Sequence, residues 1–418
     1  MLIARLRRFP ALLGLLAALI AGAVFLLTGL ASAPAAAARP ASAQLSISNA
    51  RSLGKASRCA RRVPPARLKQ MSPQQKKRMI RLMRSCRHTA TTSTAPASSL
   101  YWGAWIGDQL TGTEAPWDMG AVSKLEQSVG KQLSLVHLAA PFADCSSSPC
   151  SFYKFPTSAM EDIRNHGAIP FFSWSSSATP EDSHQRYFRL ANIINGTLDP
   201  YIRQFAESAR EWGHPFFLRF DWEMNGDWFP WGETINGNNP GEYVAAWRHV
   251  HDIFTSAGAT NATWAWCPYA EVDRSFAALA PLYPGDEYVD WTCMDGFNWG
   301  SNPTNPHSWK GFKEIFGPTY RKLVKQIAPS KPIVLAEMAS TGKGRAKAGW
   351  IRNMFEELQT NFRRVRALIW FDQVDRGVDW PLETSPRAAR AFAKGIAKTG
   401  FRPNGQAAVV ASPIRPPG

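Results

Sequence analysis

The first 98 residues of this 418-residue chain contain no aspartate or glutamate, although they hold 17 lysines and arginines. The rest of the chain holds 31 basic and 32 acidic residues. The net charge of +16 and the pI of 9.8 therefore describe the N-terminal quarter, while the main body is close to neutral. Nucleic-acid-binding proteins more often carry basic residues over their working face, so no nucleic-acid partner is expected.

Motifs for metals and phosphates are also lacking. The six cysteines include no C-x-x-C pair, no H-E-x-x-H is present, and no glycine-rich loop follows the first apolar run of the main body. These absences argue against a zinc site and a dinucleotide-binding fold, so neither a metal nor a cofactor is expected. The 17 tryptophans and 23 phenylalanines argue against a disordered chain.

The N-terminus resembles an export signal. Three arginines within the first eight residues precede a nearly continuous apolar run from Pro10 to Leu30, and small residues that offer A-x-A cleavage sites follow. The run is longer than a usual signal core and approaches the roughly 20 residues that span a bilayer. We therefore expect residues 1–33 to be a cleaved signal peptide or, alternatively, an uncleaved anchor. Both predict a secreted or cell-surface protein.

The next segments differ in composition. Residues 34–50 and 91–99 are linkers rich in Ala, Pro, Ser and Thr, and residues 403–418 are predicted to be a disordered tail. Residues 51–90 carry 13 basic residues and one predicted short helix. This basic helical segment either binds an anionic cell wall, exopolysaccharide or membrane face, or is a solvated spacer.

The cysteines are spaced as local pairs, although a sequence does not prove connectivity. Disulfides persist outside the cytoplasm, which agrees with an exported chain. The expected role is structural, and the candidates are Cys59, Cys86, Cys145, Cys150, Cys267 and Cys293.

From residue 100 onwards, short apolar runs alternate with helix-length stretches. Such alternation predicts βα units and a parallel sheet. Eight units in about 300 residues suit a (β/α)8 TIM barrel over residues 100–402, and a doubly wound open sheet is the alternative. The eight runs are 100–107, 133–142, 168–175, 215–226, 263–270, 290–299, 332–340 and 366–374, and helical stretches include 185–212, 242–257, 312–327 and 346–361.

Two strand ends of the predicted barrel carry glutamates. Active sites of this fold lie at the C-terminal ends of the strands, where Glu223 follows the fourth run and Glu337 lies in the seventh. Two facing carboxyl groups suit glycosidic bond cleavage. The alternative is that each glutamate is a surface carboxylate and that about half of the tryptophans are core residues. Tryptophans near the strand ends could contact the apolar faces of sugars, namely Trp174, Trp222, Trp228, Trp231, Trp299 and Trp370.

The stretch 219–232, which reads RFDWEMNGDWFPWG, resembles the acid/base motif of glycoside hydrolase family 26. The stretch 331–337, KPIVLAE, resembles the nucleophile strand of that family, and residues 294–299 and Trp370 resemble further family positions. The resemblance covers roughly residues 100–400.

The resemblance implies a retaining (β/α)8 hydrolase of β-linked polysaccharide, in which Glu223 is the acid/base and Glu337 the nucleophile. Retention requires carboxyl groups about 5–5.5 Å apart, and a raised pKa at Glu223. Arg219 and Asn225 are candidates to orient the carboxylates or to bind sugar hydroxyls.

The chain departs from the family pattern at two positions. Trp222 stands where the family usually has histidine, and Phe297 stands where it often has tyrosine. Both carboxylates remain, so we predict a monomeric, exported, retaining endo-β-glycanase, with β-1,4-mannan as the preferred substrate and β-1,3-xylan or mixed-linkage β-glucan as alternatives. The other hypotheses are a catalytically silent glycan-binding barrel and a cell-wall-associated structural protein whose basic segment is the functional part.

Overall fold

The computed structural model describes residues 99–270, 277–300, 308–342, 345–398, 400–401, 409 and 412–417. The predicted leader, first linker and basic helical segment lie outside these residues, as do Cys59 and Cys86. Among the helices that the structure describes, none combines the length and the apolar character needed to cross a bilayer.

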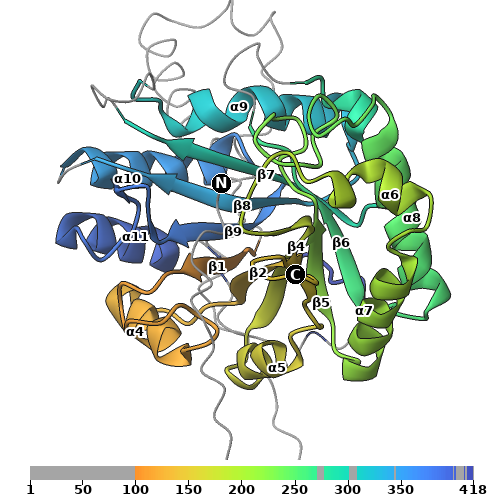
Figure 1. Ribbon diagram of the computed structural model, residues 1–418. Coiled ribbons are helices and arrows are strands. Elements are labelled where there is room, and N and C mark those ends of the chain that lie inside the picture. The colour runs from red at the N-terminus through yellow and green to blue at the C-terminus, as the bar shows by residue number, and fades with distance from the viewer. Residues whose placement is uncertain are drawn as a thin grey trace, which may run out of the picture. The chain divides into compact units, whose positions relative to one another are not determined.

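Eight parallel strands form a closed barrel (Figure 1). The barrel closes because β1 pairs in parallel with both β2 and β9. This confirms the predicted TIM barrel, and each of the eight predicted apolar runs coincides with a strand. The strands are β1 (Tyr101–Ile106), β2 (Leu135–Asp144), β4 (Ile169–Thr179), β5 (Phe216–Phe220), β6 (Ala262–Trp266), β7 (Trp291–Asn298), β8 (Ile333–Ser340) and β9 (Val365–Asp372).

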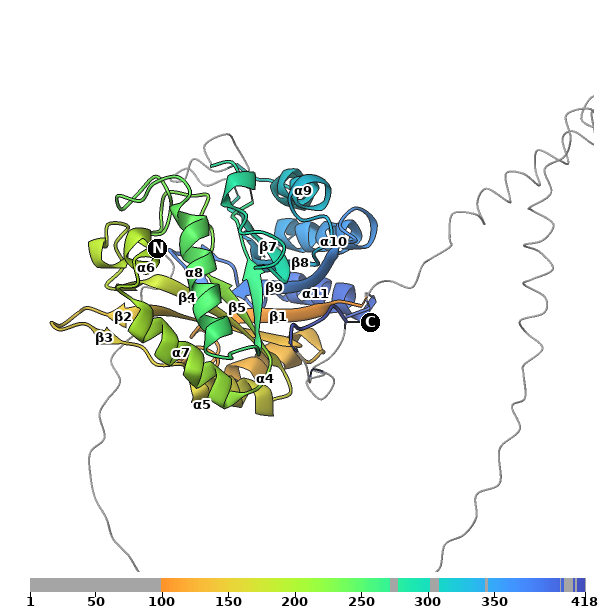
Figure 2. The same ribbon diagram turned by 90° about the vertical axis from the view of Figure 1, so that its right-hand side faces the viewer.

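Helices cover the outside of the barrel, and Figure 2 shows α7 and α8 lying over the strands β4 and β5. The main helices are α4 (Met119–Val129), α5 (Thr157–Asn165), α7 (Asp199–Trp212), α8 (Glu242–Ser256), α9 (Phe312–Lys322), α10 (Arg345–Thr360) and α11 (Pro386–Lys398). Shorter elements are β3 (Ser151–Phe152), η2 (Arg186–Phe188), α6 (Leu190–Ile194), η3 (Ala280–Leu282), η4 (Leu323–Ile327), β10 (Val374–Asp375) and β11 (Val378–Asp379).

The predicted helical stretch 185–212 is divided into η2, α6 and α7. Gly196 adopts a φ of 83°, a left-handed conformation that ends the first part. The following helix α7 begins at Asp199 with proline in its first turn and ends at Gly213, whose φ is 74°. Its buried residues recur every three or four positions, so one face of α7 packs on the barrel.

Two disulfides stabilise loops and strand ends among the described residues. Cys145–Cys150 closes the β2–β3 hairpin, and Cys267–Cys293 joins the residue after β6 to β7. Both pairs were expected from the spacing of the cysteines. The second pair lies next to the turn that carries Glu223, which is described below.

The end of the chain packs against the base of the barrel. The side chain of Ile414 is buried, its backbone N–H donates to Thr263 Oγ1 (2.8 Å), and its carbonyl accepts from Trp291 Nε1 (2.7 Å). Thr263 and Trp291 lie near the N-terminal ends of β6 and β7, where the tail satisfies their polar atoms. The prediction of a disordered tail over 403–418 is therefore wrong for residues 412–417.

Replacing Ile414 with alanine should lower the free energy of unfolding by about 2–4 kcal/mol, because a buried aliphatic side chain is removed from the base of the barrel. Arg415→Ala, at an exposed neighbouring position, is the control and should change little. Thermal and urea unfolding measure both variants. Equal, small effects would mean that the tail does not contribute to the fold.

Candidate active site

The turn after β5 places Glu223 at the mouth of the barrel. Asp221 and Glu223 have φ values of 39° and 53°, a left-handed conformation that costs on the order of 1–3 kcal/mol per residue. Neighbouring strand ends hold this turn. The carboxylate of Asp221 accepts from the backbone N–H (2.7 Å) and the hydroxyl (2.6 Å) of Ser176, and Glu223 N–H donates to the carbonyl of Cys267 (2.7 Å). The position of Glu223 is therefore fixed by contacts with β4 and with the end of β6.

Glu337 lies on β8 and is paired in register with Asp295 of β7. Arg219 of β5 reaches both carboxylates: Nη1 donates to Glu337 Oε1 (2.5 Å), and Nη2 donates to Asp295 Oδ2. All three side chains are buried. The other oxygen of Glu337, Oε2, has no hydrogen-bond partner among the described residues. Arg219 thus fixes one oxygen of Glu337 and leaves the second one available for reaction.

A neutral pair of side chains, Ser173 and His137, also contacts Arg219. The guanidinium donates to Ser173 Oγ (3.1 Å), which lies 2.7 Å from Nε2 of the buried His137. Burial and the charge of Arg219 hold the pKa of His137 well below its usual value. The imidazole therefore stays neutral beside the guanidinium.

The carboxyl group of Glu223 is almost fully buried, with 7% of the residue exposed. Burial and the negative charge of Glu337 raise the pKa of Glu223 to about 7, and the hydrogen bond from Trp228 Nε1 to Glu223 Oε2 (2.7 Å) acts in the opposite direction. A carboxyl group with this pKa holds its proton for a large fraction of the time at neutral pH. This is the property that a general acid requires.

The remaining carboxyl groups share one cation. Burial raises the pKa of Glu337 and, more strongly, that of Asp295, and the positive charge of Arg219 opposes the shift in both. Full ionisation of Glu223, Glu337 and Asp295 would leave two uncompensated negative charges in a buried site. The cluster therefore retains a proton near neutral pH. Glu223 can keep and transfer this proton, because Glu337 and Asp295 both accept hydrogen bonds from the guanidinium.

Two of the predicted sugar-binding tryptophans lie outside the barrel interior. Trp174 stacks on Phe205 of α7 with ring centroids 4.1 Å apart, and Trp370 packs on Phe392 of α11 at 5.6 Å; both tryptophans are fully buried. Successive side chains of a strand point to opposite faces. Because Ser173 points into the barrel, Trp174 must point into the helical layer. The prediction that these two residues contact sugar is therefore wrong.

Trp222 and Trp231 are buried beneath the turn that carries Glu223 and stabilise it. The ring of Trp222 lies over the guanidinium of Arg219, 4.8 Å from its central carbon. Trp231 donates its indole N–H to the carbonyl of Trp222 (2.6 Å) and stacks on Phe229 (4.4 Å between centroids). Both side chains are buried, so the sugar-platform role predicted for both residues is wrong.

Asn225 also holds the turn, since its side chain donates to the carbonyl of Tyr269 (3.0 Å) and accepts from the N–H of the same residue (2.8 Å). Trp228 and Trp299 remain as half-buried aromatic residues near the mouth. Both contact Tyr269, Trp228 through its ring and Trp299 through its indole N–H. These three residues form an aromatic cluster near the mouth of the barrel.

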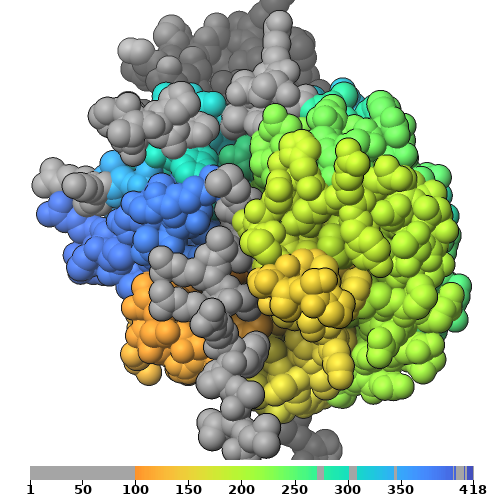
Figure 3. Space-filling view, viewed as in Figure 1, coloured from red at the N-terminus to blue at the C-terminus, as the bar shows by residue number. Residues whose placement is uncertain are grey.

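A cavity of about 310 Å³ lies beside Glu223. Its lining comes from the end of β4 with the loop that follows it and from the loop after β5, and these parts of the chain are coloured from yellow to green in Figure 3. The indole of Trp228 links this cavity to Glu223, because it lines the first and donates to the second. The lining residues are Ser177, Ala178, Glu181, Asp182, Ser183, Gln185, Trp228, Phe229, Pro230 and Trp231.

Arg219, Glu223 and Glu337 were predicted from the sequence, whereas Asp295, Ser173 and His137 had no predicted role. One feature of the sequence could have identified two of them, because Asp295 and His137 are isolated ionisable residues within apolar strands. Such residues are rarely buried without a partner. In the part of the chain that the structure describes, no three His, Cys, Asp or Glu side chains are grouped to hold a metal ion.

A closed parallel barrel with two buried carboxyl groups, one of them with a pKa of about 7, near its C-terminal strand ends is an arrangement that carboxylate-based glycosidases use. The sequence model of glycosyl hydrolase family 26 matches residues 182–361, a range that includes both Glu223 and Glu337, and this match confirms the resemblance to that family.

Several characterised proteins are similar to the chain. Endoglucanase H of Acetivibrio thermocellus is 30% identical over 308 residues, which cover 73% of this chain and 31% of that protein. A mannan endo-1,4-beta-mannosidase of Bacillus subtilis is 23% identical over 208 residues, covering 47% and 52%. The beta-1,3-xylanase TXYA of a Vibrio species is 27% identical over 109 residues, covering 26% and 22%. The chain thus spans about a third of the first relative and half of the second.

Solved structures share the fold. The Bacillus subtilis mannanase BCman superposes with a TM-score of 0.51 at 19% identity, covering 74% of this chain and 88% of that one. A Cellulomonas fimi endo-beta-1,4-mannanase variant gives 0.56 at 18% identity, covering 73% and 72%.

Replacing Arg219 with methionine should lower the free energy of unfolding by about 3–5 kcal/mol at pH 7, because Glu337 and Asp295 lose their buried cation. Without the cation the pKa values of both carboxyl groups rise further, so protonation at lower pH should reduce the loss. Urea unfolding at pH 7 and pH 5 measures this difference. The exposed Arg203→Met is the control, and an equally small effect of both variants would contradict the role of Arg219.

Proposed function

We propose that the protein is a retaining endo-β-glycanase that uses Glu223 as acid/base and Glu337 as nucleophile. The observation that carries this proposal is the unequal state of the two carboxyl groups: Glu223 has a pKa of about 7, and Glu337 is held by Arg219 through one oxygen only. Such a pair supports double displacement at an anomeric carbon.

In the first step Glu337 Oε2 attacks the anomeric carbon while Glu223 gives its proton to the departing glycosidic oxygen. A glycosyl ester forms on Glu337, and the ester carries no negative charge. The negative charge of Glu337, which raised the pKa of Glu223 in addition to burial, is thereby lost. The pKa of Glu223 then falls, and its carboxylate can accept a proton from water. That water attacks the anomeric carbon, the ester bond breaks, and Glu337 leaves as a carboxylate beside Arg219.

A β-linked glucan is the substrate that we favour, and β-1,4-mannan is the second candidate. The relative named an endoglucanase matches 308 residues at 30% identity, whereas the two Bacillus subtilis relatives named mannosidases match 208 and 163 residues at 23% and 24%. Trp222, which replaces the usual family histidine, is buried over Arg219 and offers no hydrogen bond donor from an exposed position. Both observations support a specificity that differs from the mannan expected from the sequence.

Export is part of the proposal. The arginine-flanked apolar run near the N-terminus and the disulfides Cys145–Cys150 and Cys267–Cys293 support a location outside the cytoplasm.

Release of reducing ends from mixed-linkage β-glucan, β-mannan, glucomannan and β-1,3-xylan tests the activity and the substrate together. Glu223→Gln should reduce the rate on the preferred polymer by about 10²–10⁴-fold, and Glu337→Gln should abolish it, because the amide cannot form the glycosyl ester. The exposed Glu211→Gln is the control. An initial product of the β-anomer would support retention. Binding of a polymer without release, in wild type and variants alike, would identify a silent glycan-binding barrel.

The value of kcat/KM should fall as the pH rises through about 7, because Glu223 must be protonated to act as the acid. Replacing Trp228 with phenylalanine removes a hydrogen bond that favours the carboxylate, so the pKa of Glu223 should rise and the alkaline limb should move to higher pH. The surface variant Trp117→Phe should leave the limb in place. A limb that stays fixed, or moves to lower pH, in Trp228→Phe would exclude Glu223 as the group that titrates.

A further inference from the structure

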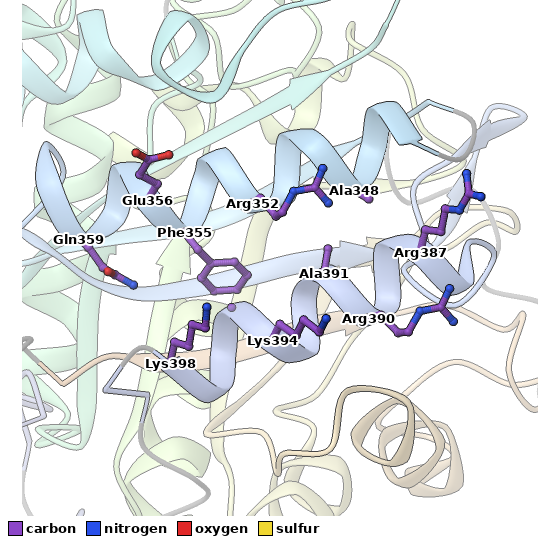
Figure 4. Close-up of a pocket in the computed structure, with 11 residues that line it drawn as sticks. Ala348, Arg352, Phe355, Glu356, Gln359, Arg387, Arg390, Ala391, Lys394 and Lys398 are labelled. Carbon is purple, nitrogen blue, oxygen red and sulfur yellow. The ribbon is translucent and has the colours of Figure 1, made fainter.

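The outer helical layer contains a second, larger concave surface. A groove of about 740 Å³ runs between α10 and α11, on the outside of the barrel (Figure 4). Eleven residues line it: Ala348, Arg352, Phe355, Glu356, Gln359, Arg387, Arg390, Ala391, Lys394, Gly395 and Lys398. We refer to this surface as the basic groove. None of these residues belongs to the active site.

Four cations of the basic groove form a row along α11. They are Arg387, Arg390, Lys394 and Lys398, and α11 contains no acidic residue. Their spacing of three or four positions places them on one side of the helix, and at 1.5 Å rise per residue the row is about 16 Å long. Arg352 adds a fifth cation from α10. The charge is therefore distributed along a line and is not focused on one point.

Nothing in the described part of the chain neutralises this charge. The five cations are exposed and form no ion pair with another described residue. The one acidic residue of the groove, Glu356, points away from α11 in Figure 4. Like charges four positions apart destabilise a helix by a few tenths of a kcal/mol each. The main body of the chain is otherwise close to neutral, so the row is a local concentration of charge.

The floor of the basic groove is apolar. The ring of Phe355 is buried between the two helices and lies against Gly395, where a Cβ atom would overlap the ring. Ala348 and Ala391 are the small residues beside it. The groove thus combines a narrow apolar floor with a row of cations, which suits a chain of sugar rings that carry anionic groups.

We propose that the basic groove binds a strand of acidic polysaccharide, with carboxylates of successive uronate residues paired to the cations of α11. Membrane binding fits less well, because the exposed large hydrophobic residues among those described (Trp117, Tyr187, Trp309 and Val374) all lie on other elements. Single-stranded nucleic acid fits less well, because the groove has no exposed aromatic ring for base stacking. Residues 1–98 of the same chain contain no acid and would be repelled.

This binding site is independent of the proposed hydrolysis. It would hold the enzyme on an acidic matrix polymer while the barrel cleaves a second, uncharged glycan. Linking two binding sites in this way raises the effective concentration of the barrel near its substrate. The two polymers would then have to occur in the same material.

The full chain and two matched charge-reversal variants test the proposal. Arg387→Glu/Lys394→Glu changes the basic groove, and Lys313→Glu/Lys325→Glu makes the same change in charge on exposed lysines of α9 and η4. The probe is polygalacturonate at about 50 mM salt, and neutral β-glucan is the reference polymer. The groove variant should bind polygalacturonate about tenfold more weakly than wild type, which corresponds to the loss of two exposed ion pairs together with repulsion by the two new carboxylates. The control should lose less than about twofold.

Thermal unfolding and hydrolysis of soluble β-glucan should be the same in all three proteins, which separates this proposal from the active site. If the groove variant does not fold, Arg387→Gln/Lys394→Gln replaces it, with an expected loss of about threefold. Equal losses in the groove and control variants, or no loss in either, would overturn the proposal. Tighter binding of wild type to anionic vesicles or to poly(dT) than to polygalacturonate would also overturn it.

Discussion

The contact of one buried guanidinium with two carboxylates is the interaction on which the rest of the site depends. Arg219 joins β5 to Glu337 of β8 and to Asp295 of β7, and it has no exposed surface. Three buried charges are stable only when they are mutually paired and hydrogen-bonded, so each strand must end at the correct height. The neutral pair Ser173 and His137 completes the surroundings without adding another charge.

The same cluster sets the protonation of Glu223. Its carboxyl group feels burial and the charge of Glu337 together, and one guanidinium does not compensate three carboxylates. The strained turn at Asp221 and Glu223 is held by Ser176 and by the carbonyl of Cys267. The position and the pKa of Glu223 therefore have a common origin, namely a buried barrel interior in which one guanidinium faces three carboxyl groups.

The aromatic residues divide among three environments. Trp174 and Trp370 fill the layer between barrel and helices, Trp222 and Trp231 support the turn that carries Glu223, and only part of the set reaches the mouth. The outer helices show a similar division. The other outer helices carry exposed residues of both charges. The basic groove, in contrast, places cations of α10 and α11 on one surface. Both patterns follow from which face of an element each residue occupies.

The sequence by itself determined the eight strands, their order and the two glutamates, because strand and helix periodicity are local and because Glu223 and Glu337 lie at strand ends. It did not determine which tryptophans face solvent, that residues 412–417 close the base, or that Asp295 shares Arg219 with Glu337. Those features depend on register between strands that are distant in sequence: Asp295 and Glu337 are 42 positions apart but directly paired. Only the closed barrel, by bringing β5, β7 and β8 around one interior, decided which charges are partners.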